Sequence, residues 1–322
     1  MFDTFGVVAL LLLISLGGWL LSRSWRAHRK GVKWIGVTLS SVLTAALAVV
    51  LFVALLGFYK ISFPPRRPPA TDVKIAVTPE NVARGAKLAV VCAGCHSPNG
   101  KSPLIGRDFF ADGGPPAGTV YAPNLTPAGE IKDWSDADVV RAIREGVHKS
   151  DRALIIMPSE SFHSLSDDDV HAIVAYLRSQ PAAGRPSPPT KLNIVGALLI
   201  GAGFPTAAQP PISQPIVGPP TGTSPEYGKY LVSLLTCQVC HGENLAGRKV
   251  RGPGPPAGPN LTAIVPHWTL DQFVHTLRTG VDPANHKLTD AMPWKAISTF
   301  ADDSDLAAIY AYLHGLKLID GL

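Results

Sequence analysis

The sequence of 322 residues predicts an all-α protein, in which two N-terminal transmembrane helices precede two tandem helical domains. Three observations predict this fold class. Two long uncharged apolar stretches lie near the N-terminus, and the remaining chain contains one pattern twice at a nearly constant offset. No alternating strand pattern of useful length accompanies the repeat. Charged residues make up only 16% of the chain, as expected where membrane segments accompany soluble parts.

The first apolar stretch, Phe5 to Leu21, is near the lower length limit for a membrane span, and the second, Ile35 to Phe58, is long enough to cross with tilt. A cleaved signal peptide is the alternative for the first stretch, but a signal peptide begins with basic residues and here only Asp3 precedes the apolar run. The positive-inside rule places the segment between the stretches in the cytoplasm. That segment carries Arg23, Arg26, Arg29, Lys30 and Lys33. We therefore expect an anchor over residues 1–62 in the cytoplasmic membrane, with the N-terminus and all later domains outside.

The remaining chain is close to neutral. After residue 68 there are 21 Lys and Arg residues against 23 Asp and Glu residues. No basic face is left for nucleic acid, so a nucleic-acid partner is excluded.

Four segments follow the anchor. A Pro-rich spacer over 63–77 favours an extended backbone, because proline lacks the amide donor of helix and sheet. We expect the first domain over 78–182, a linker over 183–223 and the second domain over 224–322. In the linker, Leu192 to Phe204 is apolar but too short to span a bilayer. The preferred interpretation is packing between the two domains or against a partner subunit, and the alternative is contact with the membrane surface.

Each domain contains the motif C-x-x-C-H near its start, at 92–96 and again at 237–241. On one helical turn, residues three and four apart share a face. Two thiolates at i and i+3 can therefore form thioethers to a porphyrin, and the histidine at i+4 reaches the iron. A zinc site would need further Cys ligands, but the two motifs contain all four cysteines. We expect two covalently attached heme c groups, held by Cys92, Cys95 and His96, and by Cys237, Cys240 and His241.

The second axial ligand is expected to be methionine. Apart from Met1, the chain contains only Met157 and Met292, each before a proline and each just before the last helix of its repeat. Core packing is the usual role of a methionine, but two matched Met-Pro pairs favour ligation, which would raise the reduction potential. The rival histidines are scattered without repeat symmetry, and we expect them to be loop or surface side chains: His148, His163, His267, His275 and His286.

Two further pairs have matching positions. Pro123 and Pro259 begin the repeated Pro-Asn-Leu-Thr, and a loop carbonyl there is expected to accept the Nδ1–H of the proximal histidine. A tight turn is the plain alternative, and both can hold. Gly85 and Gly228 lie on the first helix of each repeat, where they would allow close approach of the last helix with Tyr176 or Tyr312.

These features resemble a class I cytochrome c in each repeat: an N-terminal helix leading into C-x-x-C-H, a Pro-x-Leu loop, and Met-Pro before a C-terminal helix. The pair resembles heme domains of the cytochrome c subunits of membrane-bound alcohol, gluconate and aldehyde dehydrogenases. The residues that carry this second resemblance are 123–127, 134–138, 141–147 and 192–194. The layout of a membrane anchor with two heme domains also resembles the diheme subunit of cbb3-type oxidases.

The resemblance implies an electron-transfer protein and not an enzyme. Its expected role is to relay electrons on the outer face of the membrane as a subunit of a respiratory or other electron-transport complex. The alternative role is that of the cytochrome c subunit of a membrane-bound alcohol, sugar or aldehyde dehydrogenase. The expected partners are the lipid bilayer and integral-membrane oxidoreductase subunits, namely an oxidase, a quinol-oxidising complex or a dehydrogenase, with a soluble cytochrome c or copper protein as a further partner. A diheme peroxidase is the enzymatic alternative, and it would need an iron open to peroxide.

Overall fold

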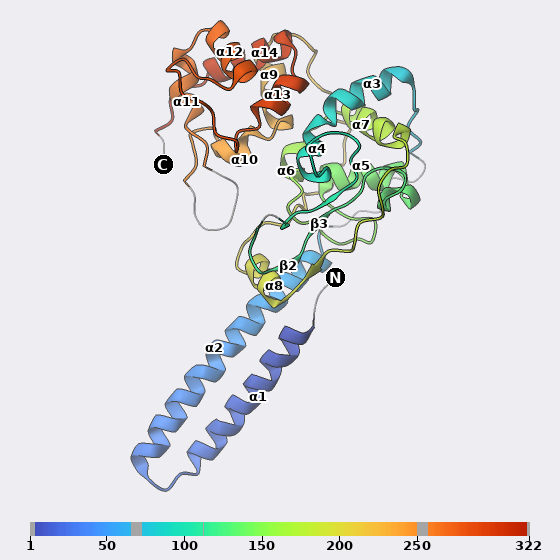
Figure 1. Cartoon of the computed structure of the whole chain (residues 1–322). Coiled ribbons are helices and arrows are strands. Elements are labelled where there is room, and N and C mark those ends of the chain that lie inside the picture. The colour runs from blue at the N-terminus through green and yellow to red at the C-terminus, as the bar shows by residue number, and fades with distance from the viewer. Residues whose placement is uncertain (1–3, 66–72, 112, 250–256, 321–322) are drawn as a thin grey trace.

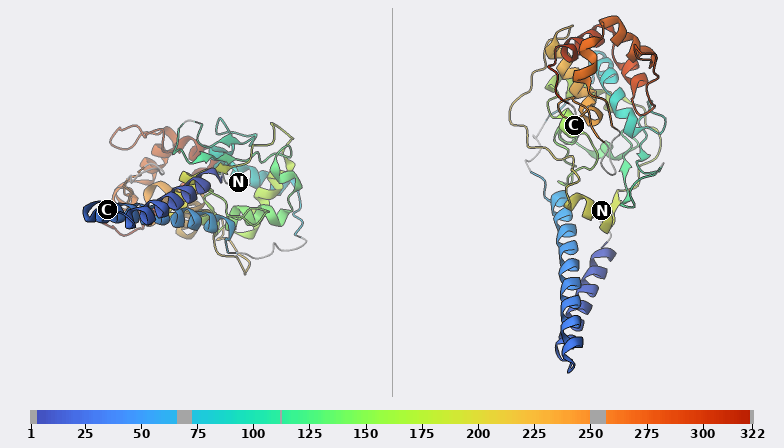
Figure 2. Two further views of the ribbon diagram at one scale, coloured as in Figure 1. Left: turned by 90° about the horizontal axis from the view of Figure 1, so that it is seen from below. Right: turned by 90° about the vertical axis from the view of Figure 1, so that its left-hand side faces the viewer.

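The structure, a computed structural model, describes residues 4–65, 73–111, 113–249 and 257–320. A long helical hairpin extends from one end of a globular part that contains both repeats (Figures 1 and 2). Residues 66–72 of the Pro-rich spacer and the first residues of Gly-Pro-Pro-Ala-Gly at 254–258 lie outside the described residues.

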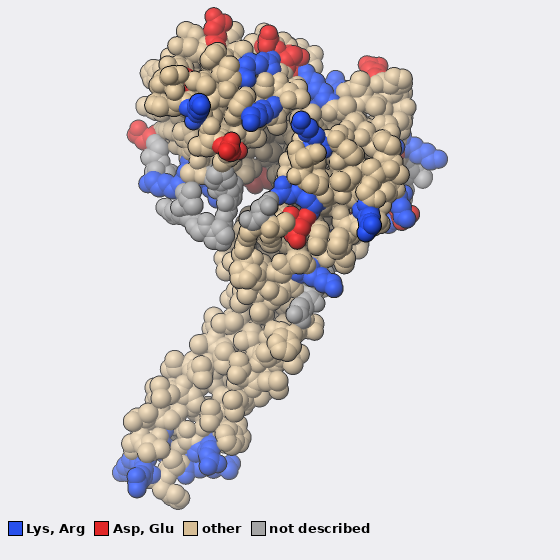
Figure 3. Space-filling model, in the orientation of Figure 1, with Lys and Arg blue, Asp and Glu red and all other residues tan. Residues whose placement is uncertain are grey.

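The hairpin consists of α1 (Phe5–Trp25) and α2 (Lys30–Ser62), both long and apolar enough to cross a membrane. Both helices extend beyond the uncharged stretches, because the flanking basic residues also favour helix. The turn between them carries the basic cluster, at the end farthest from the repeats (Figure 3). Small residues bring the two helices close together: a Cβ added at Gly17 would lie 2.3 Å from Thr44 Oγ1. Such close packing of small residues is typical of helices in lipid.

The two repeats are helical, which confirms the predicted fold class. The first contains α3 (Pro79–Leu88), α4 (Val90–His96), the 3-10 helix η1 (Glu130–Asp133), α5 (Asp136–Glu145), α6 (Ser159–Phe162) and α7 (Asp167–Ser179). The second contains α9 (Pro225–Leu234), α10 (Cys237–His241), α11 (Leu261–Ile264), the 3-10 helix η2 (Val265–His267), α12 (Leu270–Thr279), α13 (Trp294–Phe300) and α14 (Asp303–His314).

The helix starts follow their sequence signals. Thr78 and Ser224 each cap a helix whose first residue is proline, and each hydroxyl accepts a backbone N–H three residues on. α5 and α12 each begin with a capping box, Ser135 with Asp138 and Thr269 with Gln272. These caps fix where α5 and α12 begin, and so place the loops that precede them.

In each repeat the first and last helices cross in direct backbone contact. A Cβ at Gly85 would lie 1.9 Å from Ala172 O on α7, and a Cβ at Gly228 would lie 1.9 Å from Ala308 O on α14. The structure therefore confirms the predicted close approach, which only glycine permits. A matched ion pair also ties the last helix to the preceding capped helix, Arg144 with Asp167 and Arg278 with Asp303.

Short strands occur only in and beside the first repeat, among the described residues. The strands β1 (Arg107–Asp108) and β3 (Tyr121–Ala122) pair antiparallel, as do β2 (Gly118–Thr119) and β4 (Lys191–Leu192). Two-residue strands carry no alternation, so the sequence pattern does not show them.

The apolar linker segment forms α8 (Ile194–Gly201), which packs along the last turns of α2. Its position beside the hairpin differs from the expected packing between the two domains, and that part of the preferred prediction is wrong. The reason is steric fit, because glycines on both helices allow contact at backbone distance.

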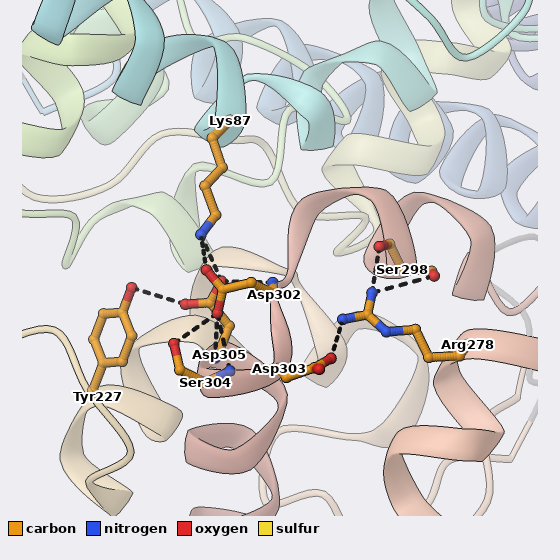
Figure 4. A network of polar contacts seen from close by, with 8 residues as sticks. All are labelled: Lys87, Tyr227, Arg278, Ser298, Asp302, Asp303, Ser304 and Asp305. Atoms are coloured by element: carbon orange, nitrogen blue, oxygen red, sulfur yellow. Dashed lines mark hydrogen bonds and ion pairs between the residues drawn. The ribbon is translucent and has the colours of Figure 1, made fainter.

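The repeats meet where α6 lies against α9 and α4 lies against α13, and two buried carboxylates hold the junction together. Asp169 of α7 accepts from Arg84 of its own repeat and from Tyr230 of the second repeat. Asp305 of α14 accepts from Tyr227 of its own repeat at 3.3 Å and from Lys87 of the first repeat at 2.6 Å (Figure 4). Relative to the contact glycines, Arg84 corresponds to Tyr227 and Lys87 to Tyr230. The junction therefore has approximate twofold symmetry. The donors to its two carboxylates are cations where they come from the first repeat and phenols where they come from the second.

Candidate heme-attachment sites

Both C-x-x-C-H motifs lie on short helices directly after the first helix of a repeat. In the first repeat α4 begins before the motif, whereas α10 begins at Cys237, after Thr236 in a left-handed backbone conformation (φ 57°). The four cysteines are free thiols, all half-buried. Burial raises the pKa of the Cys92 thiol and of the Cys237 thiol to about 12. At neutral pH both are therefore protonated and apolar in character.

The proximal histidines are oriented by the predicted loop carbonyls. His96 and His241 are buried, with 8% and 5% of their surfaces exposed. His96 Nδ1 lies 2.8 Å from Pro123 O, and His241 Nδ1 lies 2.8 Å from Pro259 O. A carbonyl can only accept, so Nδ1 carries the proton. Burial lowers the pKa of both imidazoles, which leaves each ring neutral with its lone pair on Nε2.

The rest of Pro-Asn-Leu-Thr attaches this loop to the chain beyond the last helix. The Asn124 amide donates to Ala183 O, and Thr126 exchanges two hydrogen bonds with the same residue. In the second repeat the Asn260 amide donates to Ile319 O, and the Thr262 hydroxyl accepts from Ile319 N–H. The loop is therefore more than a turn, because its polar side chains fix the proline carbonyl relative to two helices.

One glycine pair was missed in the sequence. Gly106 N–H donates to His96 O at 2.7 Å, and Gly247 N–H donates to His241 O at 2.8 Å, both from positive φ. The available signal was a repeated Gly-Arg dipeptide after each motif.

The arginines that follow these glycines lie near the second cysteine of each motif. Burial raises the pKa of the Cys95 thiol, and the positive charge of Arg107 opposes that rise in part. Burial likewise raises the pKa of the Cys240 thiol, and Arg248 opposes it. Each motif therefore has one cationic side chain close to its second thiol.

The two methionines end equivalent loops. In the first repeat Leu154 N–H donates to Gly146 O at 2.7 Å and His148 N–H to Arg152 O at 2.8 Å. In the second, Leu288 N–H donates to Gly280 O at 2.8 Å and Asp282 N–H to His286 O at 2.9 Å. The same turn thus forms from different residues. The Met157 and Met292 side chains are both partly buried against the apolar core.

Three of the rival histidines have other partners. His148 contacts Glu130 at 2.6 Å, the His163 ring donates to Arg144 O, and His286 contacts Asp282. These contacts fit the expected role as loop and surface side chains.

The residues present fit a covalently bound heme c in each repeat. Two half-buried thiols and a neutral, oriented imidazole share one helix, and a partly buried thioether is available on the loop before the last helix. In the second repeat Gly258 lies directly against the ring of the histidine, because a Cβ at this position would be only 2.7 Å from His241 Nδ1. A larger side chain there would displace the ring.

Comparison with known proteins gives matches over both repeats. The family model for cytochrome c matches residues 82–181 and 225–317, together more than half of the chain. A nicotinate dehydrogenase subunit of Pseudomonas putida is 30% identical over 89% of this chain and 25% of its own length. The fructose dehydrogenase cytochrome subunit of Gluconobacter japonicus is 26% identical over 73% of this chain and 52% of its own length. The gluconate 2-dehydrogenase cytochrome c subunit of Pantoea cypripedii is 40% identical over 30% of this chain and 22% of its own length. The chain thus covers about a quarter of the length of the first relative and about half of the length of the second.

Proposed function

This chain belongs to the cytochrome c family, and from that premise we propose that it is the membrane-anchored electron-transfer subunit of a dehydrogenase complex. It is an electron-transfer cytochrome with covalently bound heme c. The observation that carries the proposal is the duplicated arrangement of thiols, histidine and loop carbonyl. Two such arrangements imply two heme c groups on one chain, joined by a fixed junction.

Each heme would be held by residues of one repeat. Cys92 and Cys95 would form its thioether bonds in the first repeat, with His96 and Met157 as axial ligands. Cys237, Cys240, His241 and Met292 would do the same in the second. The bound heme supplies a one-electron Fe(III)/Fe(II) couple. Pro123 and Pro259 hold each imidazole in the tautomer that presents Nε2, and the methionine sulfur would be the second ligand of each iron. With both ligands bound, the chain would transfer electrons and carry no reaction of its own.

The anchor sets the side of the membrane. The basic turn lies at the far end of the hairpin from the repeats (Figure 3). The positive-inside rule therefore supports a cytoplasmic turn and heme domains on the outer, periplasmic face of the cytoplasmic membrane. This orientation suits covalent heme attachment, which takes place outside the cytoplasm.

The partner follows from the relatives. Those named above are subunits of nicotinate, fructose and gluconate dehydrogenases. A dehydrogenase is therefore the favoured electron donor, and an oxidase, a quinone-linked complex or a soluble cytochrome c or copper protein would act as acceptor.

The test is purification from native membranes in mild detergent with an affinity tag on the cytochrome. We expect a dehydrogenase to co-purify and its substrate to reduce the heme c absorption bands of the complex. A matched Cys237→Ala/Cys240→Ala variant should retain half of the heme c measured per chain. Co-purification of a terminal oxidase without a dehydrogenase would contradict the proposed donor, and one heme c per wild-type chain would contradict the two sites.

A further inference from the structure

We propose that residues 192–204 form a re-entrant segment within the membrane, in the leaflet on the side of the heme domains. The segment would be a third membrane-embedded element beside α1 and α2. Lipid acyl chains would cover the surface of this segment that the protein leaves exposed.

The first argument is depth along α2. A Cβ at Gly57 would lie 2.0 Å from Ala197 O, and a Cβ at Gly201 would lie 1.9 Å from Val53 O. From the first of these contacts to the second, the position on α8 advances by four residues and the position on α2 goes back by four. α8 therefore runs antiparallel to α2, toward the membrane interior. Val53 lies five residues before Phe58, where the apolar stretch of α2 ends. At 1.5 Å per residue the tip of α8 lies roughly 7 Å below that end, within a leaflet core of roughly 15 Å.

The second argument is the apolar surface around α8. The segment from Leu192 to Phe204 contains no charged residue. Exposed aromatic and aliphatic side chains of the hairpin continue this surface, on α2 at Phe52, Leu55 and Tyr59 and on α1 at Phe5. At its other end α8 reaches the start of α1, where a Cβ at Gly6 would lie 2.5 Å from Ile194 Cβ. Figure 1 shows α8 beside the outer ends of both hairpin helices.

The third argument is the backbone at the tip. In hydrocarbon a free carbonyl costs several kcal/mol, so a chain reversal there must satisfy its own polar groups. Three of the last four carbonyls of α8 accept hydrogen bonds from the residues that follow the helix. Phe204 N–H donates to Leu199 O at 2.9 Å, and Gly203 N–H donates to Ile200 O at 3.2 Å.

A lysine completes this set of donors. Lys60 of α2 donates from Nζ to Ile200 O at 3.2 Å. Its ammonium group meets the carbonyl end of α8, where the helix dipole is negative. At the N-terminal end the Asn193 side chain accepts from Val195 and Gly196. Hydrogen bonds within the protein therefore satisfy polar backbone groups at both ends of α8.

The chain enters and leaves this segment beside the first heme domain. On entry Leu192 pairs with Gly118, and on exit Thr206 bridges Ile155, two residues before Met157. The descent and return thus begin and end on one side of the membrane, as a re-entrant segment requires. A spanning helix is excluded by the length of α8.

The test measures collision of a nitroxide with oxygen, which dissolves in lipid, and with a nickel chelate, which stays in water. The nitroxide is attached to single cysteines at three positions. The test position is Ala202, which lies at the tip of the segment. The two reference positions are Val217 of the same linker, which is 90% exposed, and Val49 of α2, which is 61% exposed. The native cysteines are consumed by heme. The holoprotein is placed in phosphatidylcholine nanodiscs, and its heme spectrum verifies folding.

We expect the ratio of oxygen to nickel collisions at A202C to lie between the ratios at V217C and V49C and to exceed that at V217C several-fold. A ratio at A202C equal to that at V217C would place the tip in water and overturn the proposal. Exclusion of both reagents at A202C would mean that protein covers the tip, which also overturns it. If A202C does not fold, L199C on the same helix gives the same comparison.

Discussion

The two repeats share one internal plan and differ in what surrounds their methionine loops. In both, the loop before the methionine is closed by the same backbone bonds, and the isolated bridges Val147 to Ala153 and Val281 to Lys287 match. Among the described residues, only the loop of the first domain is also bonded to the anchor, because Ala153 N–H donates to Ile61 O of α2 at 2.8 Å. The loop geometry is therefore intrinsic to the repeat, and attachment to the membrane helix was added to it.

The largest expected effect comes from removing the methionines. Met157→Ala and Met292→Ala should each lower the potential of one heme by an amount on the order of 0.1 V or more, because thioether favours Fe(II). Each variant should also bind CO at that heme in its ferrous form. Spectroelectrochemical titration checks this, and the comparison shows which potential belongs to the membrane-attached domain. Two unchanged midpoint potentials would refute the axial assignment.

Next in size is the loss of the helix crossing. Gly85→Ala and Gly228→Ala should each destabilise their domain by about 1–3 kcal/mol, since the added methyl group meets a backbone carbonyl. Guanidinium unfolding followed by circular dichroism measures the change. Gly31→Ala is the control, because its Cβ would meet nothing within 4 Å and the residue lies outside both repeats. A cost in only one domain would mean that the two crossings are not equivalent.

Smaller effects are expected at the junction. Tyr230→Phe removes a donor to the buried Asp169 and should cost about 1–3 kcal/mol. Tyr227→Phe removes the longer bond to Asp305 and should cost less. Unfolding of the two variants side by side tests this order, and equal costs would contradict the geometry.

The smallest expected effect is a dependence on alkaline pH. Burial and the nearby carboxylates raise the pKa of Tyr227 and Tyr230. Burial alone would lower the pKa of Lys87, but hydrogen bonds to Asp305 and Asp302 outweigh it and raise that pKa. The folded state holds these protons more tightly, so the stabilisation is complete below about pH 10 and is lost as the pH rises further. The free energy of unfolding should fall above that pH, and less steeply in the Tyr227→Phe/Tyr230→Phe variant. An unchanged slope would assign the effect to other groups.

The sequence predicted those features that depend on residue type at fixed spacing. The two hairpin helices, the caps and the close approach at Gly85 and Gly228 follow from local rules and are present. The proline carbonyls also lie where the proximal histidines need them. The methionine loops show where prediction from sequence stops. His148 and Asp282 occupy equivalent positions in these loops, but backbone hydrogen bonds hold them there, and such bonds leave no pattern in the side chains. The placement of α8 was missed because its fit to α2 depends on glycines far apart in the chain.

The junction carries one more consequence, which concerns pairing between molecules. Each buried carboxylate receives one cation and one phenol: Asp169 has Arg84 and Tyr230, and Asp305 has Lys87 and Tyr227. If two first repeats met through the same surface, each carboxylate would face two cations, and if two second repeats met, each would face two phenols and no cation. Only the unlike pair is electrically balanced. The surface that joins the domains therefore also discourages pairing between two like domains of neighbouring chains in a crowded membrane.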